Sequence, residues 1–173
     1  LTDDNIKTPL IIKYPGAQKN IQISNVVGHE DIIPTIFDIL DVPMKRHQDN
    51  HKFRGQSLLN IIENNETDSR IKRSDTRLQM DIGKITSLRS NPYKYIYFHD
   101  DDYELLFNMV DDPDEINNLS KLKNPLIQGQ INNFKNIIKE YEIELFNYHK
   151  IALLDNFGLF ANNENIIFDK ILI

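Results

Sequence analysis

The chain has 173 residues, of which 40% are hydrophobic and 27% charged, and this composition is typical of a folded domain with one hydrophobic core. Its 20 basic and 26 acidic residues give a formal net charge of −6, so we expect no nucleic-acid partner. We also expect no membrane span, because no apolar run reaches the roughly 18 residues that one requires. The chain has no cysteine, which excludes disulfides, thiolate metal ligands and a cysteine nucleophile within it.

The first third of the chain predicts one strand and two helices. Residues 9–16, PLIIKYPG, indicate a short buried strand that ends at a Pro-Gly turn. In HEDIIPTIFDILDVP, Asp31 suits an N-cap, Pro34 suits the first helical turn, and Pro43 ends the helix. GQSLLNIIENN predicts a short second helix from about Ser57. The apolar residues of the first helix form a broad face that we expect to be buried: Ile32, Ile33, Ile36, Phe37, Ile39 and Leu40.

The next part of the chain predicts a meander of three or four short antiparallel strands. From Thr76 onward, apolar residues at 78, 80 and 82 alternate with polar ones, and residues 85–89 continue extended. A turn at Ser90-Asn91-Pro92 leads to a strand at 93–98. A second turn leads to a strand at 103–109.

A long helix of about 125–148 follows, with Asn124 as its cap and Pro125 at its first position. One apolar stripe predicts that the helix packs on the sheet: Ile127, Ile131, Phe134, Ile138, Tyr141 and Leu145. The tail after about residue 150 mixes apolar clusters with Asn and Asp, which leaves its structure open, with further strands as one interpretation. A polar stretch near residue 70, NNETDSRIKRSD, predicts a boundary between two parts, 1–70 and 71–173.

Five motifs in chain order resemble the C-terminal part of sulfatases, which belong to the alkaline-phosphatase superfamily. They are PLIIKYPG, HEDIIPT, GQSLL, YKYIYF and LFNMVDDPDEINNL, and the resemblance covers roughly residues 6–145. It implies an α/β fragment of alkaline-phosphatase type. Residues 1–70 would be the last strand and helices of the α/β catalytic domain. Residues 71–173 would be an α+β subdomain, a small antiparallel sheet packed by the long C-terminal helix.

The resemblance also implies a function, the hydrolysis of a sulfate ester in the complete enzyme. Sulfatases use a formylglycine made from the Cys or Ser of a C/S-x-P-x-R motif, together with calcium or magnesium. The family carries these residues N-terminal to its counterpart of PLIIKYPG. We therefore expect no catalytic residue, no metal ligand and no bound cofactor in this chain, and no activity from it alone. Its partners would be a sulfate-ester substrate and a missing N-terminal catalytic part.

Two alternatives stay open. The chain could be part of another hydrolase of the superfamily, a phosphodiesterase or a phosphonate monoester hydrolase, which shares some of these motifs. It could also be a non-catalytic binding or structural module derived from the family. The residue at the nucleophile position of the complete protein would separate the hydrolases, since Thr there favours phosphoryl chemistry.

Few side chains in the chain are candidates for direct chemistry. His29, two residues before Asp31, is the one candidate for lining the substrate cleft. The pair His47 and His51 has the spacing of a helical zinc site, but its polar surroundings favour a solvated loop. Lys94 in YKYIYF could face either the cleft or solvent.

Three further patterns are interpreted as turns. Ser90-Asn91-Pro92-Tyr93-Lys94 resembles the nucleophile motif with Lys in place of Arg, but it falls where a turn is expected, and Lys does not replace the planar Arg. Residues 99–102, HDDD, lack the spacing and the glycine of a calcium loop. In VDDPDEINNL, the acidic residues are assigned to a turn, followed by a short helix in which Asp114 and Glu115 favour the first turn.

Overall fold

The computed structural model describes residues 1–18, 20–43, 55–64, 69–77 and 83–157, without the side chains of 77 and 148–157. The chain forms two compact units, Leu1–Ile131 and Asn132–Ile173. The boundary near residue 70 that the sequence predicts stays a prediction. Among the described helices, none combines the length and apolar character needed to cross a membrane.

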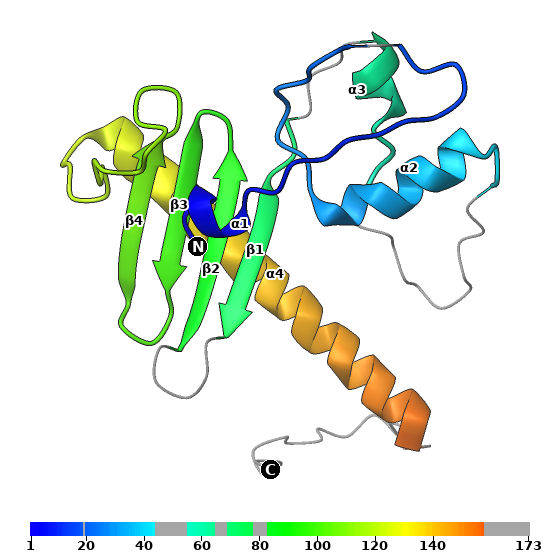
Figure 1. Cartoon of the computed structure of the whole chain (residues 1–173). Helices are drawn as coiled ribbons and strands as arrows, with labels where there is room; N and C mark the ends of the chain where they lie inside the picture. Colours follow the sequence, from blue (N-terminus) through cyan, green and yellow to red (C-terminus); the bar gives the residue numbers. More distant parts are fainter. Residues whose placement is uncertain (19, 44–54, 65–68, 78–82, 158–173) are drawn as a thin grey trace. The chain divides into compact units, whose positions relative to one another are not determined.

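The N-terminal part has short helices joined by extended chain (Figure 1), with α1 at Asp3–Ile6, a 3-10 turn η1 at His29–Asp31, α2 at Ile32–Ile39 and α3 at Leu59–Asn64. The two helices predicted from the sequence are therefore confirmed. The buried strand predicted at 9–16 is wrong, because this stretch has no strand structure and Ile11 is 91% exposed. A strand exists only through hydrogen bonds to a neighbour, and no described segment pairs with this one.

Four antiparallel strands form one sheet in the order β1-β2-β3-β4, as Figure 1 shows. They are β1 (Lys72–Arg77), β2 (Lys84–Ser90), β3 (Tyr93–Phe98) and β4 (Tyr103–Asn108). The meander is thus confirmed for its last three strands. The first strand lies in the polar stretch KRSDTR rather than in the alternating residues 78–82, which fall outside the described residues.

Both faces of the sheet are apolar at its centre. One face carries a cluster of Ile85, Ile96, Phe107 and Met109. On the opposite face, Leu88, Tyr95 and Leu106 are each 0% exposed. The register places Leu88 opposite Tyr95 and Tyr95 opposite Leu106, so the alternation of a strand sorts the two sets onto opposite faces.

The long helix α4 runs from Pro125 to Phe157. Asn124 caps it, since the backbone N–H of Leu126 donates to Asn124 Oδ1 at 2.9 Å. The helix is longer than predicted, and its extension makes the strand interpretation of 151–157 wrong; residues 158–173 lie outside the described part. Four residues of the predicted stripe are buried, namely Ile127, Ile131, Phe134 and Ile138, whereas Leu145 is 36% exposed. The sheet and the C-terminal helix confirm the expected α+β arrangement of this part of the family fold.

The turn after β4 is confirmed, but the short helix predicted to follow it is not formed. The carboxylate of Asp112 accepts the backbone N–H groups of Ile116 at 3.0 Å and Asn117 at 2.8 Å. Glu115 adopts a φ of +55°, a left-handed conformation that interrupts any right-handed helix. The acidic residues of this stretch therefore shape the loop.

Candidate functional site around His29 and Asp31

His29 is the first residue of η1, directly before the helix α2. Its side chain is exposed, whereas the side chain of Asp31, two residues further on, is completely buried. The short turn thus separates an outward imidazole from an inward carboxylate. The structure places the one cleft candidate of the sequence at the surface.

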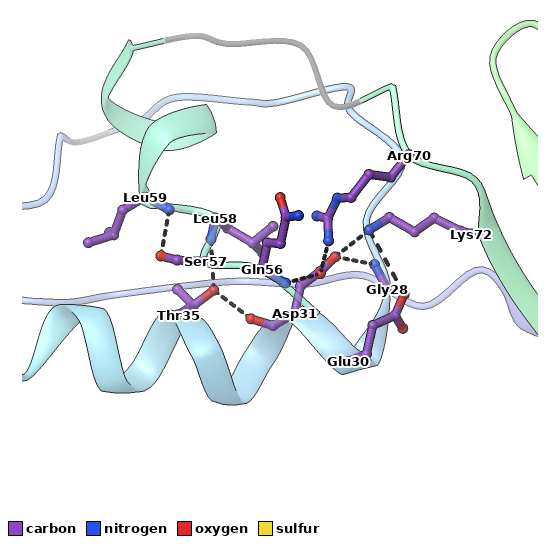
Figure 2. A network of polar contacts seen from close by, with 10 residues as sticks. All are labelled: Gly28, Glu30, Asp31, Thr35, Gln56, Ser57, Leu58, Leu59, Arg70 and Lys72. Carbon is purple, nitrogen blue, oxygen red and sulfur yellow. Dashed lines mark hydrogen bonds and ion pairs between the residues drawn. The ribbon is translucent and has the colours of Figure 1, made fainter. Parts of the chain in front are cut away.

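The carboxylate of Asp31 is the centre of a polar network (Figure 2). Its Oδ1 accepts the backbone N–H of Gln56 at 2.9 Å and the guanidinium of Arg70 at 2.9 Å. Its Oδ2 accepts the backbone N–H of Gly28 at 3.0 Å and the ammonium of Lys72 at 2.6 Å. Four donors from three separate segments therefore converge on one side chain.

These contacts set the charge of Asp31. Burial opposes ionisation, but the hydrogen bonds from Lys72, Gly28, Gln56 and Arg70 outweigh it, so the pKa of Asp31 lies below its ordinary value. A carboxylate offers about four lone-pair positions, and the four donors occupy them. Asp31 is therefore a saturated anion, unsuited to act as a general base or as a metal ligand here.

Asp31 occupies the N-cap position of α2, as predicted, but the capping role expected of its side chain is wrong. Its side chain makes no capping hydrogen bond to α2. The carboxylate turns back to Gly28 and across to Gln56, because burying a charge requires opposite charges and donors that the first helical turn does not supply.

The same network joins two of the sequence motifs. Thr35, from HEDIIPT, donates its hydroxyl to the Asp31 carbonyl at 2.6 Å and accepts the N–H of Leu58, from GQSLL, at 2.9 Å. Gly55 approaches Glu30 so closely that a Cβ at position 55 would lie 1.7 Å from the Glu30 carbonyl oxygen. The spacing of both motifs thus follows from the way in which they contact each other.

Sequence reasoning missed Arg70 and Lys72. Both belong to the basic run RIKR, which was assigned to a polar joint. The available signal was the pairing rule: a buried carboxylate needs cationic partners, and this run is the nearest basic cluster after the two motifs. The side chain of Lys72 is 8% exposed and that of Arg70 is 25% exposed, which fits an ion pair shielded from water.

Lys94, for which the sequence left open a position facing the cleft or solvent, faces neither. It is 0% exposed, and its ammonium pairs with Asp3 at 2.6 Å and with the carboxylate of Glu115. Both acidic partners hold it inside the fold of the first unit. Lys94 is therefore a structural cation.

The remaining sequence candidates are a histidine pair and two turns. The pair His47 and His51 lies outside the described residues. Ser90 is the last residue of β2, at the turn into β3, which confirms the turn interpretation. In the turn 99–102, Asp102 accepts the hydroxyl of Tyr97 at 2.7 Å, and His99 Nε2 lies 2.9 Å from Thr86 Oγ1.

The residues that the structure describes do not fit the calcium or magnesium ion implied by the family resemblance. In this part of the chain, no three His, Cys, Asp or Glu side chains come together as a metal site. What the arrangement offers is a single exposed imidazole on a turn that a buried ion network supports.

Comparisons with known proteins agree with the motifs. Residues 1–144 match the family model described as N-sulphoglucosamine sulphohydrolase, C-terminal. Over 122 residues the chain is 31% identical to arylsulfatase K of Bos taurus and 31% identical to arylsulfatase K of Homo sapiens. Each match covers 65% of this chain and 22% of the relative, so the chain spans less than a quarter of the length of these relatives.

A solved structure shares the fold. The Bacteroides fragilis protein yidJ, described as a sulfatase, superposes with a TM-score of 0.50 and is 18% identical. The superposition covers 63% of this chain and 24% of that chain. At this identity the likeness concerns the fold alone.

Proposed function

The chain belongs to the sulfatase family, as a C-terminal portion of the N-sulphoglucosamine sulphohydrolase type, and from this premise we propose that it helps to bind a sulfate ester in a complete hydrolase. The nucleophile and the metal ligands of that enzyme would come from a separate, N-terminal part. Alone, the chain would be inactive. The observation that carries the proposal is the family match over residues 1–144, together with the hydrogen bonds that join two of its motifs.

Within this function, His29 contacts the substrate. Its imidazole is exposed and can donate a hydrogen bond to an oxygen of the sulfate ester or of the group that carries it. Asp31 is a positioning residue, because its four hydrogen bonds fix the turn from which His29 projects. The relatives named arylsulfatase K support an aryl sulfate as the first substrate to test.

The test combines this chain with the part of bovine arylsulfatase K that lies outside the aligned region. Both polypeptides are co-expressed, and hydrolysis of 4-nitrophenyl sulfate is measured for the pair and for each part alone. We expect hydrolysis by the pair and none by this chain. Hydrolysis by this chain alone would contradict its predicted inactivity, and a pair that forms but does not hydrolyse the ester would contradict the proposed function.

A His29→Ala variant tests the contact to substrate. Losing one hydrogen bond to a charged group costs about 1.5–3 kcal/mol, so kcat/KM of the pair should fall by roughly tenfold to a hundredfold. Lys123→Ala, which changes an exposed side chain in the loop before α4, should leave kcat/KM unchanged. Equal kcat/KM for the co-expressed pairs that carry His29→Ala and Lys123→Ala would show that His29 does not contact the substrate.

The same assay separates the alternatives. A pair that hydrolyses bis-4-nitrophenyl phosphate in preference to the sulfate would favour the phosphodiesterase interpretation. A stable pair that hydrolyses neither ester would favour a binding or structural module.

A further inference from the structure

The turn from which His29 projects is held by the residues on either side of it. Gly28 donates its backbone N–H to Asp31 Oδ2 at 3.0 Å, which closes the turn on itself. Gly28 also makes room for a neighbour, because a Cβ there would lie 2.2 Å from Glu30 Oε2. The carboxylates of Glu30 and Asp31 therefore both lie close to Gly28, while His29 is exposed.

Both carboxylates also lie near one ammonium group. Lys72 Nζ is 2.6 Å from Asp31 Oδ2 and 3.9 Å from Glu30 Oε1, as Figure 2 shows. Only the shorter distance is a hydrogen bond, and the longer one is an ion pair with a side chain that is 38% exposed. Lys72 is thus a cation shared by the two acidic residues that follow His29.

Lys72 is suited to hold the turn because its own position is fixed by the sheet. It is the first residue of β1, where the register pairs it with Arg89 of β2. Its side chain is 8% exposed, so water screens its attraction to the carboxylates less than it would at the surface. The turn itself is one turn of 3-10 helix with little rigidity of its own, and the paired strand supplies the rigid support.

The other two distant donors to Asp31 act on a different oxygen. The backbone N–H of Gln56 and the guanidinium of Arg70 both donate to Oδ1. Oδ2 is the oxygen that closes the turn, since it accepts the N–H of Gly28, and it is also the oxygen that Lys72 binds. Lys72 therefore acts on the side of the carboxylate that determines the shape of the turn.

We propose that Lys72 is a positioning residue for His29. By holding Asp31 and Glu30, it fixes the turn and with it the direction in which the imidazole meets the substrate. This inference rests on the proposed function, in which His29 contacts the sulfate ester. Lys72 acts through the turn, since its ammonium is buried in the polar network. Its effect on hydrolysis should then exist only while His29 is present.

A cycle of single and double variants in the co-expressed pair tests this dependence. Lys72→Gln removes the charge and keeps a hydrogen-bond donor. We expect it to lower kcat/KM for 4-nitrophenyl sulfate about tenfold, because a small misplacement of a contacting group is enough for such a loss. In the His29→Ala background, Lys72→Gln should cause no further loss. Lys123→Ala removes an exposed cation outside the network and should change kcat/KM in neither background.

The position of the turn is measured separately, in the 173-residue chain alone. Hydrogen exchange of the Gly28 amide reports on the closed turn, because this N–H is bonded to Asp31. We expect faster exchange at Gly28 in Lys72→Gln and an unchanged rate in Lys123→Ala. Lys72→Arg keeps the charge and should bring both the exchange rate and kcat/KM back toward the values of the unchanged chain.

Glu30→Ala carries the same test if Lys72→Gln fails to fold, because position 30 is exposed. It should speed exchange at Gly28 and lower kcat/KM only in chains that contain His29. Two results would overturn the proposal: an equal loss of kcat/KM with and without His29, which a purely structural role would give, or an unchanged exchange rate at Gly28. Faster exchange without any loss of kcat/KM would keep Lys72 as the support of the turn and reject the function proposed for His29.

Discussion

Lys94 and Glu115, 21 residues apart in the sequence, form an ion pair in which the two side chains are 0% and 3% exposed. The pair links the start of β3 to the loop that follows β4. The same carboxylate accepts the backbone N–H of Asp3 at 3.1 Å, so it also holds the start of the chain. The loop reaches this position with a backbone that few residues other than glycine adopt, since φ of Glu115 is +55°.

Glu115→Gln should therefore destabilise the fold strongly. The substitution leaves a buried ammonium with Asp3 as its remaining anionic partner. Removing one member of a buried ion pair costs about 3–5 kcal/mol, and we expect the lower end of that range because Asp3 stays in place. Urea unfolding followed by circular dichroism measures the loss of unfolding free energy.

Two further variants sharpen that test. Asp114→Asn removes the neighbouring, exposed carboxylate and should change the unfolding free energy by less than about 0.5 kcal/mol. The double variant Lys94→Met with Glu115→Gln also removes the buried ammonium that has lost its Glu115 partner, and it should recover part of the loss. A Glu115→Gln chain as stable as the Asp114→Asn chain would show that the pair contributes nothing.

Asp31 makes the stability depend on pH. Its pKa is below the ordinary value of 3.8, because the hydrogen bonds from Lys72, Gly28, Gln56 and Arg70 outweigh the opposing effect of burial. Between the lower pKa of the folded chain and the ordinary value, the unfolded chain therefore binds more protons than the folded chain. The contribution of Asp31 is complete above pH 3.8 and is lost as the pH falls through the lower, folded pKa.

Asp75 behaves in the same direction, since burial is outweighed by hydrogen bonds from Arg73 and Thr86, and its pKa is also lowered. Asp31→Asn should accordingly flatten, without abolishing, the rise of the unfolding free energy as the pH increases toward and through the ordinary carboxyl pKa. At pH 7 it should cost about 3 kcal/mol, because Lys72 and Arg70 lose their buried anion. Asp38→Asn, at an exposed position of α2, is the control, and an equal pH profile for both variants would refute the role of Asp31.

The sequence predicts those helices and strands that depend on interactions between residues close together in the chain. β3, β4 and the start of α4 follow from aromatic and branched alternation, from turn residues and from the Asn124 cap. β1 is not predictable in this way, because KRSDTR has no apolar alternation and is a strand through its register with β2, where Arg73 lies opposite Leu88. The stretch 9–14 is the reverse case, an apolar pattern that finds no partner strand among the described residues.

The candidate site likewise has one part that a local motif predicts and one part that only the tertiary fold determines. His29 and Asp31 are found from their motif, but three of the four donors to Asp31 lie 25, 39 and 41 residues further along the chain. Such contacts depend on the tertiary fold, and no local pattern ranks one basic residue above another as a partner. A local rule, the preference of Asp for N-caps, therefore gives the right place and the wrong role.

Gly55 offers a test of the contact between the two motifs. A Cβ there would lie 1.7 Å from the carbonyl oxygen of Glu30 and 2.2 Å from its carbonyl carbon, so the backbone would have to move. We expect Gly55→Ala to lower the thermal midpoint and to cost about 1–3 kcal/mol. Gly129→Ala is the matched control, since a Cβ there meets nothing within 4 Å and alanine favours the helix by about 1 kcal/mol. Equal midpoints for both variants would mean that the two motifs are not in contact at Gly55.

Asn118 holds the loop after β4 through its side chain. Two substitutions at this position separate the contribution of its acceptor oxygen from that of its amide donor. Its Oδ1 accepts the backbone N–H of Leu106 at 3.0 Å and that of Ser120 at 2.9 Å, while its amide group reaches the Glu104 carbonyl only at 3.5 Å. Asn118→Ala leaves the N–H of Leu106, a residue that is 0% exposed, without its acceptor, at a cost of about 1–3 kcal/mol. Asn118→Asp keeps the acceptor and should lose less than half as much at pH 7. Unfolding in urea measures both, and equal losses would show that the amide donor rather than the acceptor holds the loop.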